Sequence, residues 1–143
     1  MVQMLECWID ASWVHNGQQG TGMAFAIFHA GTLVRYQLEP TESTSPFHAE
    51  LKTLIMAIHE LARMGITDCC FYTDCKELQQ LINDETCIST VEWQTFHDEN
   101  DIVVFWNCNK YQNWYCAHIS REGNFFVDGL ARYAMIRNVQ LHV

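Results

Sequence analysis

The sequence predicts an α/β fold in which a mixed sheet is covered by helices. Three strand-like segments joined by short loops come first, and they suggest an antiparallel meander. Strand-like and helix-like segments then alternate along the chain, as they do where strands are connected through helices. A length of 143 residues is about the commonest size for one domain, so we expect a single domain over residues 1–143.

The first third of the chain has the composition of strands. Residues 5–12 are rich in β-forming side chains and end in Asp10-Ala11-Ser12, which places Asp10 at the end of the first predicted strand. A polar loop over residues 16–20 leads to the apolar run 23–28. After a short turn, residues 32–38 alternate like a half-buried strand.

A helix is predicted between Ser45 and Gly65. Ser45 can serve as its N-cap, Pro46 fits the first helical position, and Gly65 stands where a helix-ending glycine belongs. Apolar residues recur at helical spacing between these ends. Glu50 falls on the apolar stripe that should face the sheet, which is an unusual place for a carboxylate.

The second half of the chain alternates between strands and helices. The clear segments are the strand 69–73, the short amphipathic helix 76–83, the last strand 114–119 and the last helix 125–137. Between the helix 76–83 and the strand 114–119, residues 91–96 and 102–106 could belong to one helix with a polar interruption.

The seven cysteines indicate neither a disulfide framework nor a zinc site, because their number is odd and they form no C-x-x-C pair. We interpret them as small buried apolar residues of a reducing compartment, which predicts an intracellular protein of the nucleus or cytoplasm. No run of eighteen apolar residues and no basic-then-apolar leader occurs. We therefore expect neither a membrane span nor a signal peptide.

The charge balance is acidic. Eight Lys and Arg residues stand against seventeen Asp and Glu residues, which gives a net charge of −9. Nucleic-acid affinity depends largely on Lys and Arg that neutralise phosphates, so this balance argues against strong binding by the chain alone. A basic partner or a fused domain could supply the missing grip.

Four acidic residues stand where a purely structural role does not favour them. Asp10 and Asp74 each follow an apolar strand, Glu50 lies on the apolar stripe of the first helix, and Asp128 lies in the first turns of the last helix. If the two strands are neighbours, Asp10 and Asp74 meet at the strand ends where α/β sheets bind ligands. Two carboxylates about 4 Å apart repel by roughly 4 kcal/mol at an effective dielectric constant near 20.

Divalent cations remove this repulsion, and oxygen ligands without converging His or Cys suit Mg²⁺ or Mn²⁺. Two such ions about 4 Å apart can hold a phosphodiester, activate a water and stabilise the departing oxygen. For any one acid a plain helix cap is the simpler interpretation, and Asp74 alone could cap the helix that follows it. The arrangement of all four favours a metal site.

Four segments resemble the ribonuclease H-like domains of plant retroelement reverse transcriptases and their domesticated relatives. They are W-I-D-A-S (8–12), H-A-E-L (48–51), Y-T-D-C-K-E-L (72–78) and R-E-G-N-F-F-V-D-G-L-A-R (121–132). The resemblance runs from about Cys7 to Ala134, and the last motif is the most specific. It implies a ribonuclease H-like α/β fold with a five-stranded mixed sheet flanked by helices, the first three strands antiparallel and the last two parallel.

The resemblance also implies an activity. In that family, four acids in the order Asp, Glu, Asp, Asp bind two Mg²⁺ ions and cleave the RNA strand of an RNA–DNA hybrid, and Mn²⁺ can stand in for Mg²⁺. By position they correspond to Asp10, Glu50, Asp74 and Asp128. Proofreading-type exonucleases differ because they carry Asp-x-Glu on the first strand, where this chain has Ser12. A domesticated binding or scaffold domain with little or no turnover is the alternative.

Three residues near the last motif are further candidates. His118 lies ten residues before Asp128, which resembles the mobile histidine that assists proton transfer or product release in many ribonucleases H. A histidine that simply ends the last strand is an equal alternative. Arg121 could contact a phosphate, replace that histidine or pair with a surface acid. Asn124 could touch substrate, although a cap of the last helix is favoured.

Three more candidates could contact nucleic acid. Ser45 falls where related enzymes use a hydroxyl and a helix N-terminus to grip a DNA phosphate, and capping alone explains it equally well. Trp13 could stack on a base or sugar, although an ordinary strand-end aromatic is favoured. Lys76 could reach a phosphate or simply be solvated.

Bacterial-type ribonucleases H often carry a basic segment, called the handle, that holds the hybrid, whereas the stretch 84–110 of this chain has Lys110 as its only Lys or Arg. We therefore expect weak, salt-sensitive hybrid binding.

Overall fold

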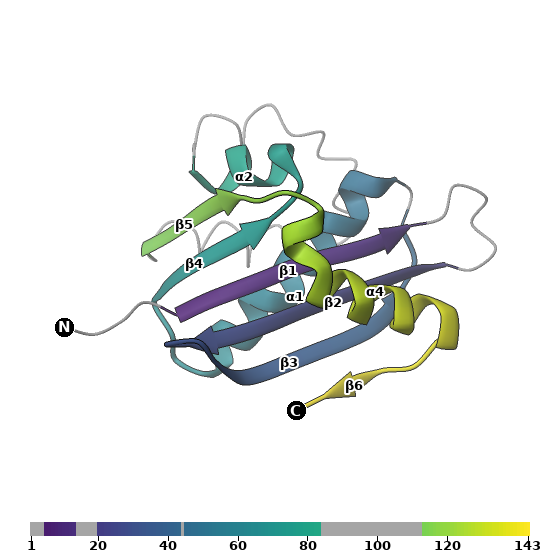
Figure 1. The fold of residues 1–143 in the computed structure, drawn as a ribbon, viewed down its shortest axis with the longest axis horizontal. Coiled ribbons are helices and arrows are strands. Elements are labelled where there is room, and N and C mark those ends of the chain that lie inside the picture. Colours follow the sequence, from purple (N-terminus) through teal and green to yellow (C-terminus); the bar gives the residue numbers. More distant parts are fainter. Residues whose placement is uncertain (1–4, 14–19, 44, 84–112) are drawn as a thin grey trace.

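The computed structural model describes residues 5–13, 20–43, 45–83 and 113–143 (Figure 1). In chain order its elements are β1 (Leu5–Trp13), β2 (Thr21–His29), β3 (Thr32–Thr41), α1 (Pro46–Arg63), β4 (Asp68–Thr73), α2 (Lys76–Asn83), β5 (Asn113–His118), the 3₁₀-helix η3 (Glu122–Asn124), α4 (Phe125–Arg137) and β6 (Leu141–His142). The predicted helices 76–83 and 125–137 are confirmed. The segments 91–96 and 102–106 lie outside the described residues.

The strands form one mixed sheet with the order β5-β4-β1-β2-β3-β6. β1, β2 and β3 pair antiparallel, and β4 and β5 extend the sheet in parallel from β1, as predicted. The expected number of five strands is wrong, because β6 adds a sixth beside β3. Its two paired residues are too few to show the alternation by which a strand is recognised in a sequence.

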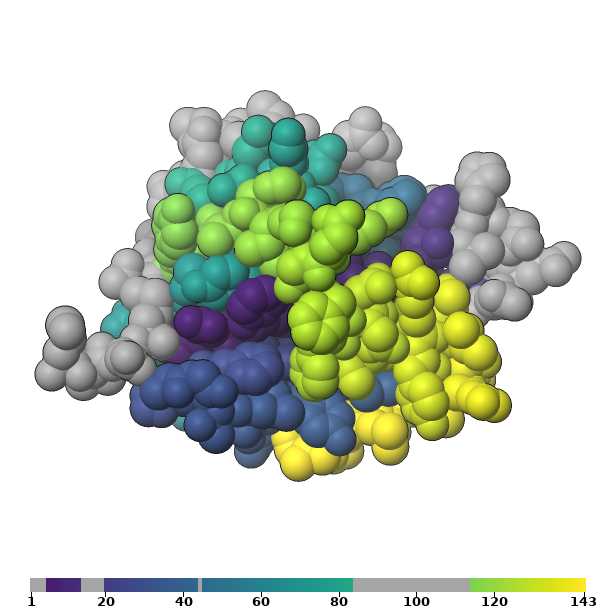
Figure 2. All heavy atoms as spheres, viewed as in Figure 1, coloured from purple at the N-terminus to yellow at the C-terminus, as the bar shows by residue number. Residues whose placement is uncertain are grey.

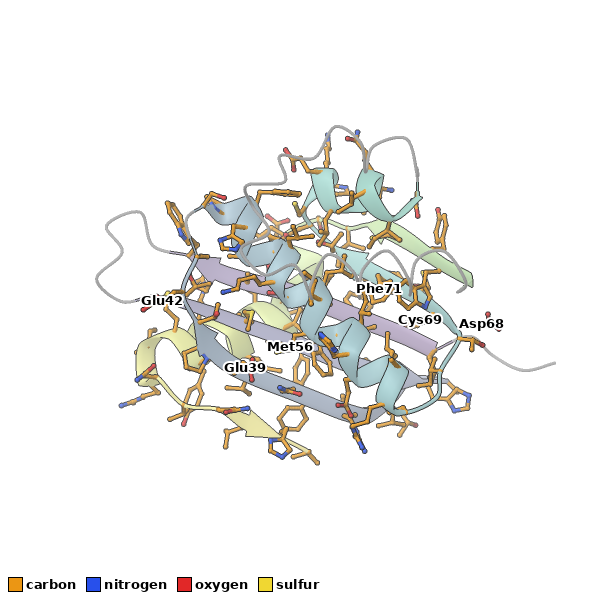
Figure 3. The ribbon with its side chains drawn as sticks, turned by 180° about the vertical axis from the view of Figure 1, so that it is seen from behind. Glu39, Glu42, Met56, Asp68, Cys69 and Phe71 are labelled. Carbon is orange, nitrogen blue, oxygen red and sulfur yellow. The ribbon has the colours of Figure 1, made fainter. Side chains whose placement is uncertain are left out.

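Helices cover both faces of the sheet (Figure 1). On one face α1 runs across the strands, and Figure 3 shows it from behind. Its Leu51, Leu54 and Ile58 are fully buried against a core that includes Phe25 and Phe71. Fully burying an aliphatic side chain of this size contributes roughly 1.5–3 kcal/mol. Burial of these apolar side chains therefore holds α1 on the sheet, and it fixes the position of Glu50 at the same time.

α4 lies on the opposite face. Its buried residues are the small Val127, Ala131 and Ala134, which pack on Ala24 and Ala26 of β2. Figure 2 shows this face as spheres: α4 covers part of the sheet, while atoms of β1, β4 and β5 stay visible beside it. Small side chains on both surfaces let α4 approach the sheet closely. This approach brings the beginning of α4 over β1.

The ends of α1 follow the local signals that predicted them. Ser45 has an extended backbone and its Oγ accepts a hydrogen bond of 3.0 Å from the His48 N–H. At the other end Gly65 has a φ of +72°, and the Gly65 and Ile66 N–H groups donate back to carbonyls of the last turn. This is the arrangement in which a left-handed glycine ends a helix. The predicted bounds of this helix are confirmed.

The first strand ends one residue beyond its predicted end at Ser12, and Asp10 lies inside it where the strand end was expected. β1 continues to Trp13, where it still pairs with Thr21 of β2, while its pairing with β4 stops at Trp8 and Tyr72. The long antiparallel neighbour β2 supports β1 beyond the point where the pairing of β1 with β4 ends. Asp10 therefore lies inside β1, two residues beyond Trp8, the last residue of β1 that pairs with β4. No helix of the described part is long and apolar enough to cross a membrane.

Candidate active site

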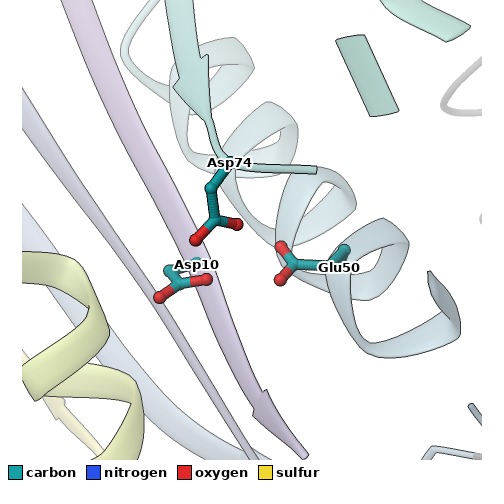
Figure 4. A group of neighbouring side chains, drawn as sticks. All are labelled: Asp10, Glu50 and Asp74. Carbon is teal, nitrogen blue, oxygen red and sulfur yellow. The ribbon is translucent and has the colours of Figure 1, made fainter. Parts of the chain in front are cut away.

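Three carboxylates converge beside β1 (Figure 4). Asp10 comes from β1, Glu50 from α1 and Asp74 from the bend after β4. Each offers one oxygen, and these three oxygens all lie within 4.8 Å of one another. The predicted convergence of these three acids, which are far apart in the sequence, is therefore present in the structure.

The turn after β4 places Asp74. β4 ends at the buried Thr73, whose Oγ1 accepts a hydrogen bond of 3.1 Å from the Cys75 N–H. This bond turns the chain out of the strand and toward α2, which begins at Lys76. Figure 4 shows the Asp74 carboxylate pointing toward Asp10 and Glu50. The side chain is thus directed into the acidic group and away from the start of α2.

Burial and mutual repulsion make this group electrostatically unfavourable. Asp10 is 3% exposed, and burial, followed by the charge of Asp74, raises its pKa to about 8. Burial and then the charge of Asp10 raise the pKa of Glu50 well above its ordinary range. Burial also raises the pKa of Asp74, although the positive charge of Arg121 opposes this effect. Positive charge from Arg121 and His118 thus acts on Asp74, whereas burial and the neighbouring acids dominate at Asp10 and Glu50.

Asp128 lies beside this group and has its own partner. It lies close enough to Asp10 to raise the pKa of that carboxyl, and its Oδ2 is 3.2 Å from Nε of Arg132, one turn further along α4. Among the described residues, the cluster of converging oxygens contains Asp10, Glu50 and Asp74 without Asp128. A cluster of four acids was expected. The structure has a cluster of three, and Asp128 lies next to it. The pairing with Arg132 was missed, although an acid and an arginine four residues apart in a helix indicate it.

The three clustered acids fit a divalent cation. All the donor atoms are carboxylate oxygens, which Mg²⁺ and Mn²⁺ prefer. Oε2 of Glu50 is buried and has no hydrogen-bond partner among the described residues. A buried carboxylate oxygen without a partner is costly, and a cation would remove both this cost and the repulsion between the acids. Asp10, Glu50 and Asp74 are the residues that could hold such an ion.

His118 and Arg121 stand at the Asp74 side of the site. His118 ends β5 opposite Thr73, and its Nε2 lies 3.2 Å from the Asp74 backbone oxygen. Both side chains are exposed, and the positive charge of each lowers the pKa of Asp74. They are therefore close enough to the acids to act on a ligand bound there, while their chemical roles stay predictions.

Asn124 departs from both of its expected roles. It occupies the N-cap position of α4 but makes no capping hydrogen bond with its side chain, so the favoured cap interpretation is wrong. It is also 1% exposed, which leaves it no surface for contact with substrate. Its Nδ2 instead donates to the Ile9 carbonyl at 3.0 Å. Local sequence rules do not reveal this bond because its acceptor lies 115 positions away.

The other candidates for nucleic-acid contact are placed as follows. Ser45 caps α1, Lys76 is exposed at the start of α2, and Trp13 is half-buried at the end of β1. These positions agree with the structural alternative given for each residue. Their contacts with nucleic acid stay predictions.

Residues 9–134 match the family model described as reverse transcriptase-like. No curated protein sequence matches the chain significantly. Among solved structures, RNase H1 from the halophilic archaeon Halobacterium salinarum NRC-1 has 17% identity and a TM-score of 0.72, over 93% of this chain and 98% of that chain.

Two further structures are similar over most of both chains. LC11-RNase H1, isolated from compost by a metagenomic approach and solved with an RNA/DNA hybrid, has 17% identity and a TM-score of 0.74 over 93% of this chain and 97% of its own. The RNase H domain of PFV has 13% identity and a TM-score of 0.69 over 94% of this chain and 96% of its own. These likenesses show that the chain has the ribonuclease H fold.

Proposed function

The chain belongs to the reverse transcriptase-like family, and on this basis we propose that it is a divalent-metal-dependent endonuclease that hydrolyses the RNA strand of RNA–DNA hybrids. One observation supports this function above all: the buried Asp10 and the half-buried Glu50 and Asp74 offer carboxylate oxygens that all lie within 4.8 Å of one another. A similar structure, LC11-RNase H1, binds an RNA/DNA hybrid.

Asp10, Glu50 and Asp74 would hold the divalent ions, two Mg²⁺ by preference, with Asp128 available beside Asp10. When bound, these ions neutralise charge on the phosphodiester and favour ionisation of an attacking water. Glu50 is fixed by the buried stripe of α1, and Asp10 by pairing of β1 with β2. Such rigid supports hold ligands within the narrow geometry that metal sites need.

Two exposed cationic or titratable side chains would act on the substrate. Arg121 carries a permanent positive charge beside Asp74, where it would attract a phosphate of the incoming strand. His118 would transfer a proton to the leaving oxygen, a role that imidazole side chains serve in general acid–base catalysis. Ser45, Lys76 and Trp13 are the remaining candidates for strand contact.

Binding of the hybrid is proposed to be weak and sensitive to salt. A net charge of −9 repels phosphates, and the four site acids account for only part of it. A basic partner or a fused domain would supply the missing affinity. A filter-binding titration that gives nanomolar affinity at physiological salt would contradict this part of the proposal.

The decisive experiment is cleavage of a labelled RNA–DNA hybrid with Mg²⁺ or Mn²⁺. We expect cuts within the RNA strand, and a loss of rate of at least about 100-fold in Asp10→Asn and in Asp74→Asn. Asp68→Asn is the matched control, because it removes a carboxylate at the exposed start of the same strand, β4. Its rate should stay within about twofold of the wild type. Activity that survives both site substitutions would place the chemistry elsewhere.

The acidic charge balance and the lack of a basic handle in residues 84–110 argue against efficient turnover, and they favour a second candidate function, a domesticated nucleic-acid-binding or scaffold domain with little or no catalysis. In that case the protein would bind hybrid without cutting it at any Mg²⁺ or Mn²⁺ concentration. Asp10→Asn would then bind the hybrid at least as well as the wild type, because asparagine cannot carry a charge that repels phosphates. The same titration and cleavage assays separate the two functions.

A further inference from the structure

The side chain of Asn124 connects the two backbone segments that carry Asp10 and Asp128. We propose that Asn124 is a positioning residue, which fixes the spacing between Asp10 and Asp128 and thereby sets the affinity of the acidic site for divalent cations. This inference rests on the proposed function, because it takes the acids to be the ligands of those cations.

The bond itself has ordinary length, is buried, and joins residues far apart in the sequence. Asn124 Nδ2 donates to the Ile9 carbonyl at 3.0 Å, and the two residues are 1% and 0% exposed. Ile9 directly precedes Asp10, and Asn124 precedes Asp128 by four residues, about one turn of helix. A single hydrogen bond thus joins β1 and the start of α4 next to both acids.

The position of Ile9 explains why this bond is needed. β1 pairs with β4 only as far as Trp8 and Tyr72, so Ile9 lies one residue beyond the last pair. At this point β4 turns away to place Asp74 in the site. The amide of Asn124 donates to the strand just past the point where β4 stops. The chain can therefore open a space for the acids without leaving the Ile9 carbonyl unpaired.

Simpler explanations of Asn124 do not fit its contacts. It makes no side-chain capping bond at the start of α4, and its burial keeps it from the surface. Its Oδ1 is buried without a hydrogen-bond partner among the described residues. An apolar residue would avoid that cost if the position only had to be filled. The donated bond to Ile9 is therefore the property that requires an asparagine.

Loss of this bond should act on the first turn of α4 and leave the rest of the helix in place. Val127, Ala131 and Ala134 anchor the helix to β2 and β3. The beginning of the helix crosses β1 in Figure 1, and it is joined to β1 by the buried hydrogen bond from Asn124 to Ile9. Without it the Asp128 carboxylate loses its fixed distance from Asp10. Groups that hold metal ligands in place typically change metal affinity by about 10–100-fold when removed.

The test compares Asn124→Leu with a matched control, Asn83→Leu. Leucine branches at the same carbon as asparagine, carries methyl groups in place of the amide oxygen and nitrogen, and cannot donate a hydrogen bond. Asn83 makes the same kind of bond elsewhere: its Nδ2 donates to the Cys116 carbonyl at 2.8 Å and its Oδ1 accepts from the Cys116 N–H, which ties α2 to β5. Both variants lose a side-chain tie to a strand, but only Asn124 holds the segments of Asp10 and Asp128.

The primary readout is Mn²⁺ affinity, measured by calorimetry without nucleic acid, alongside the melting temperature of each metal-free protein. We expect Asn124→Leu to bind Mn²⁺ at least about tenfold more weakly than the wild type, and Asn83→Leu to bind within about twofold of it. Cleavage by Asn124→Leu should recover when Mn²⁺ is raised in proportion. If Asn124→Leu does not fold, Asn124→Ser, which is too short to reach Ile9, takes its place with Asn83→Ser as control.

The outcomes separate this inference from the proposed function. Unchanged Mn²⁺ affinity in a folded Asn124 variant, with an active wild type, overturns the positioning role and leaves the nuclease intact. Equal losses in the Asn124 and Asn83 variants also overturn it, because they indicate a general structural effect. A wild type that binds no Mn²⁺ overturns both proposals.

Discussion

Gly22 of β2 lies directly against the Ala131 carbonyl of α4. A Cβ atom on Gly22 would stand 1.8 Å from the Ala131 oxygen and 2.8 Å from the Met135 nitrogen. Both are backbone atoms, so α4 would have to move off the sheet. We expect Gly22→Ala to lower the free energy of unfolding by about 2–3 kcal/mol, at the upper end of ordinary overpacking costs. Urea denaturation of the metal-free protein measures this change.

Gly129 provides a control with the opposite sign. It lies in α4 itself, and a Cβ there would meet nothing within 4 Å. Alanine at an exposed helical position is favoured over glycine by about 0.8–1 kcal/mol. Gly129→Ala should therefore stabilise the protein. A Gly22→Ala variant as stable as the wild type would show that α4 does not lie this close to β2.

The stability of the metal-free protein should fall as the pH rises toward 8. Burial first, and then the charge of Asp74, raises the pKa of Asp10 from 3.8 to about 8 in the folded protein. The unfolded chain loses this proton near 3.8, so between these values the folded state binds more protons and loses stability with rising pH. Asp10→Asn keeps the neutral shape and should stabilise the protein at pH 8 by at least about 1.4 kcal/mol.

Urea titrations in EDTA at several pH values measure this effect as the difference between Asp10→Asn and the wild type. The difference should shrink as the pH falls toward 4, because Asp10 is then protonated in the folded wild type. Asp68→Asn, at an exposed position of β4, should change stability by less than about 0.5 kcal/mol throughout. Destabilisation by Asp10→Asn at pH 8 would contradict the raised pKa.

Removal of Arg132 should strengthen divalent-ion binding slightly. Its Nε lies 3.2 Å from Oδ2 of Asp128, and the two side chains are 60% and 25% exposed. Exposed ion pairs of this kind contribute about 0.2–1 kcal/mol, so Arg132→Gln should tighten Mn²⁺ binding by roughly 1.5- to 5-fold if Asp128 is a ligand. Calorimetry measures the change.

Arg137→Gln removes the same charge from the last turn of α4 and serves as the control. Equal tightening in both variants would attribute the effect to the net charge of the helix. No change in either variant would place Asp128 outside the set of ligands, which would leave Asp10, Glu50 and Asp74 to bind the ion.

Cys116 should be chemically inert in the folded protein. Its side chain is 0% exposed, and burial above all raises its pKa to about 12. Since the thiolate is the reactive form, alkylation by iodoacetamide at pH 8 should be much slower at Cys116 than at the partly exposed Cys70. Peptide mass spectrometry resolves the two sites. Comparable rates would mean that the β4–β5 part of the core opens readily.

The elements that the sequence predicts well are those with local causes. The ends of α1 follow from Ser45, Pro46 and Gly65, whose backbone preferences act within a few residues. The meeting of Asp10 and Asp74 follows from the pairing of their strands, and the placement of Glu50 from the apolar stripe of its helix. The sequence therefore predicts the grouping of these three acids.

The features that the sequence does not predict depend on distant partners. Asn124 has the sequence position of a helix cap, yet it bonds to Ile9 because the fold places β1 beneath it. β1 extends past Asp10 because β2 continues alongside it. The separation of Asp128 from the other acids depends on how α4 sits on the sheet. In each case the deciding contact joins segments whose relation only the folded chain establishes.

The short strand β6 has a consequence for how copies of the protein behave toward one another. Tyr36 of β3 and Val143 exchange two backbone hydrogen bonds, of 3.3 and 3.0 Å, directly after the paired residues of β6. A bare edge strand offers these same groups to any extended chain it meets and can template aggregation. Residues 141–143 occupy part of the β3 edge, so they leave fewer of its backbone groups open to another extended chain.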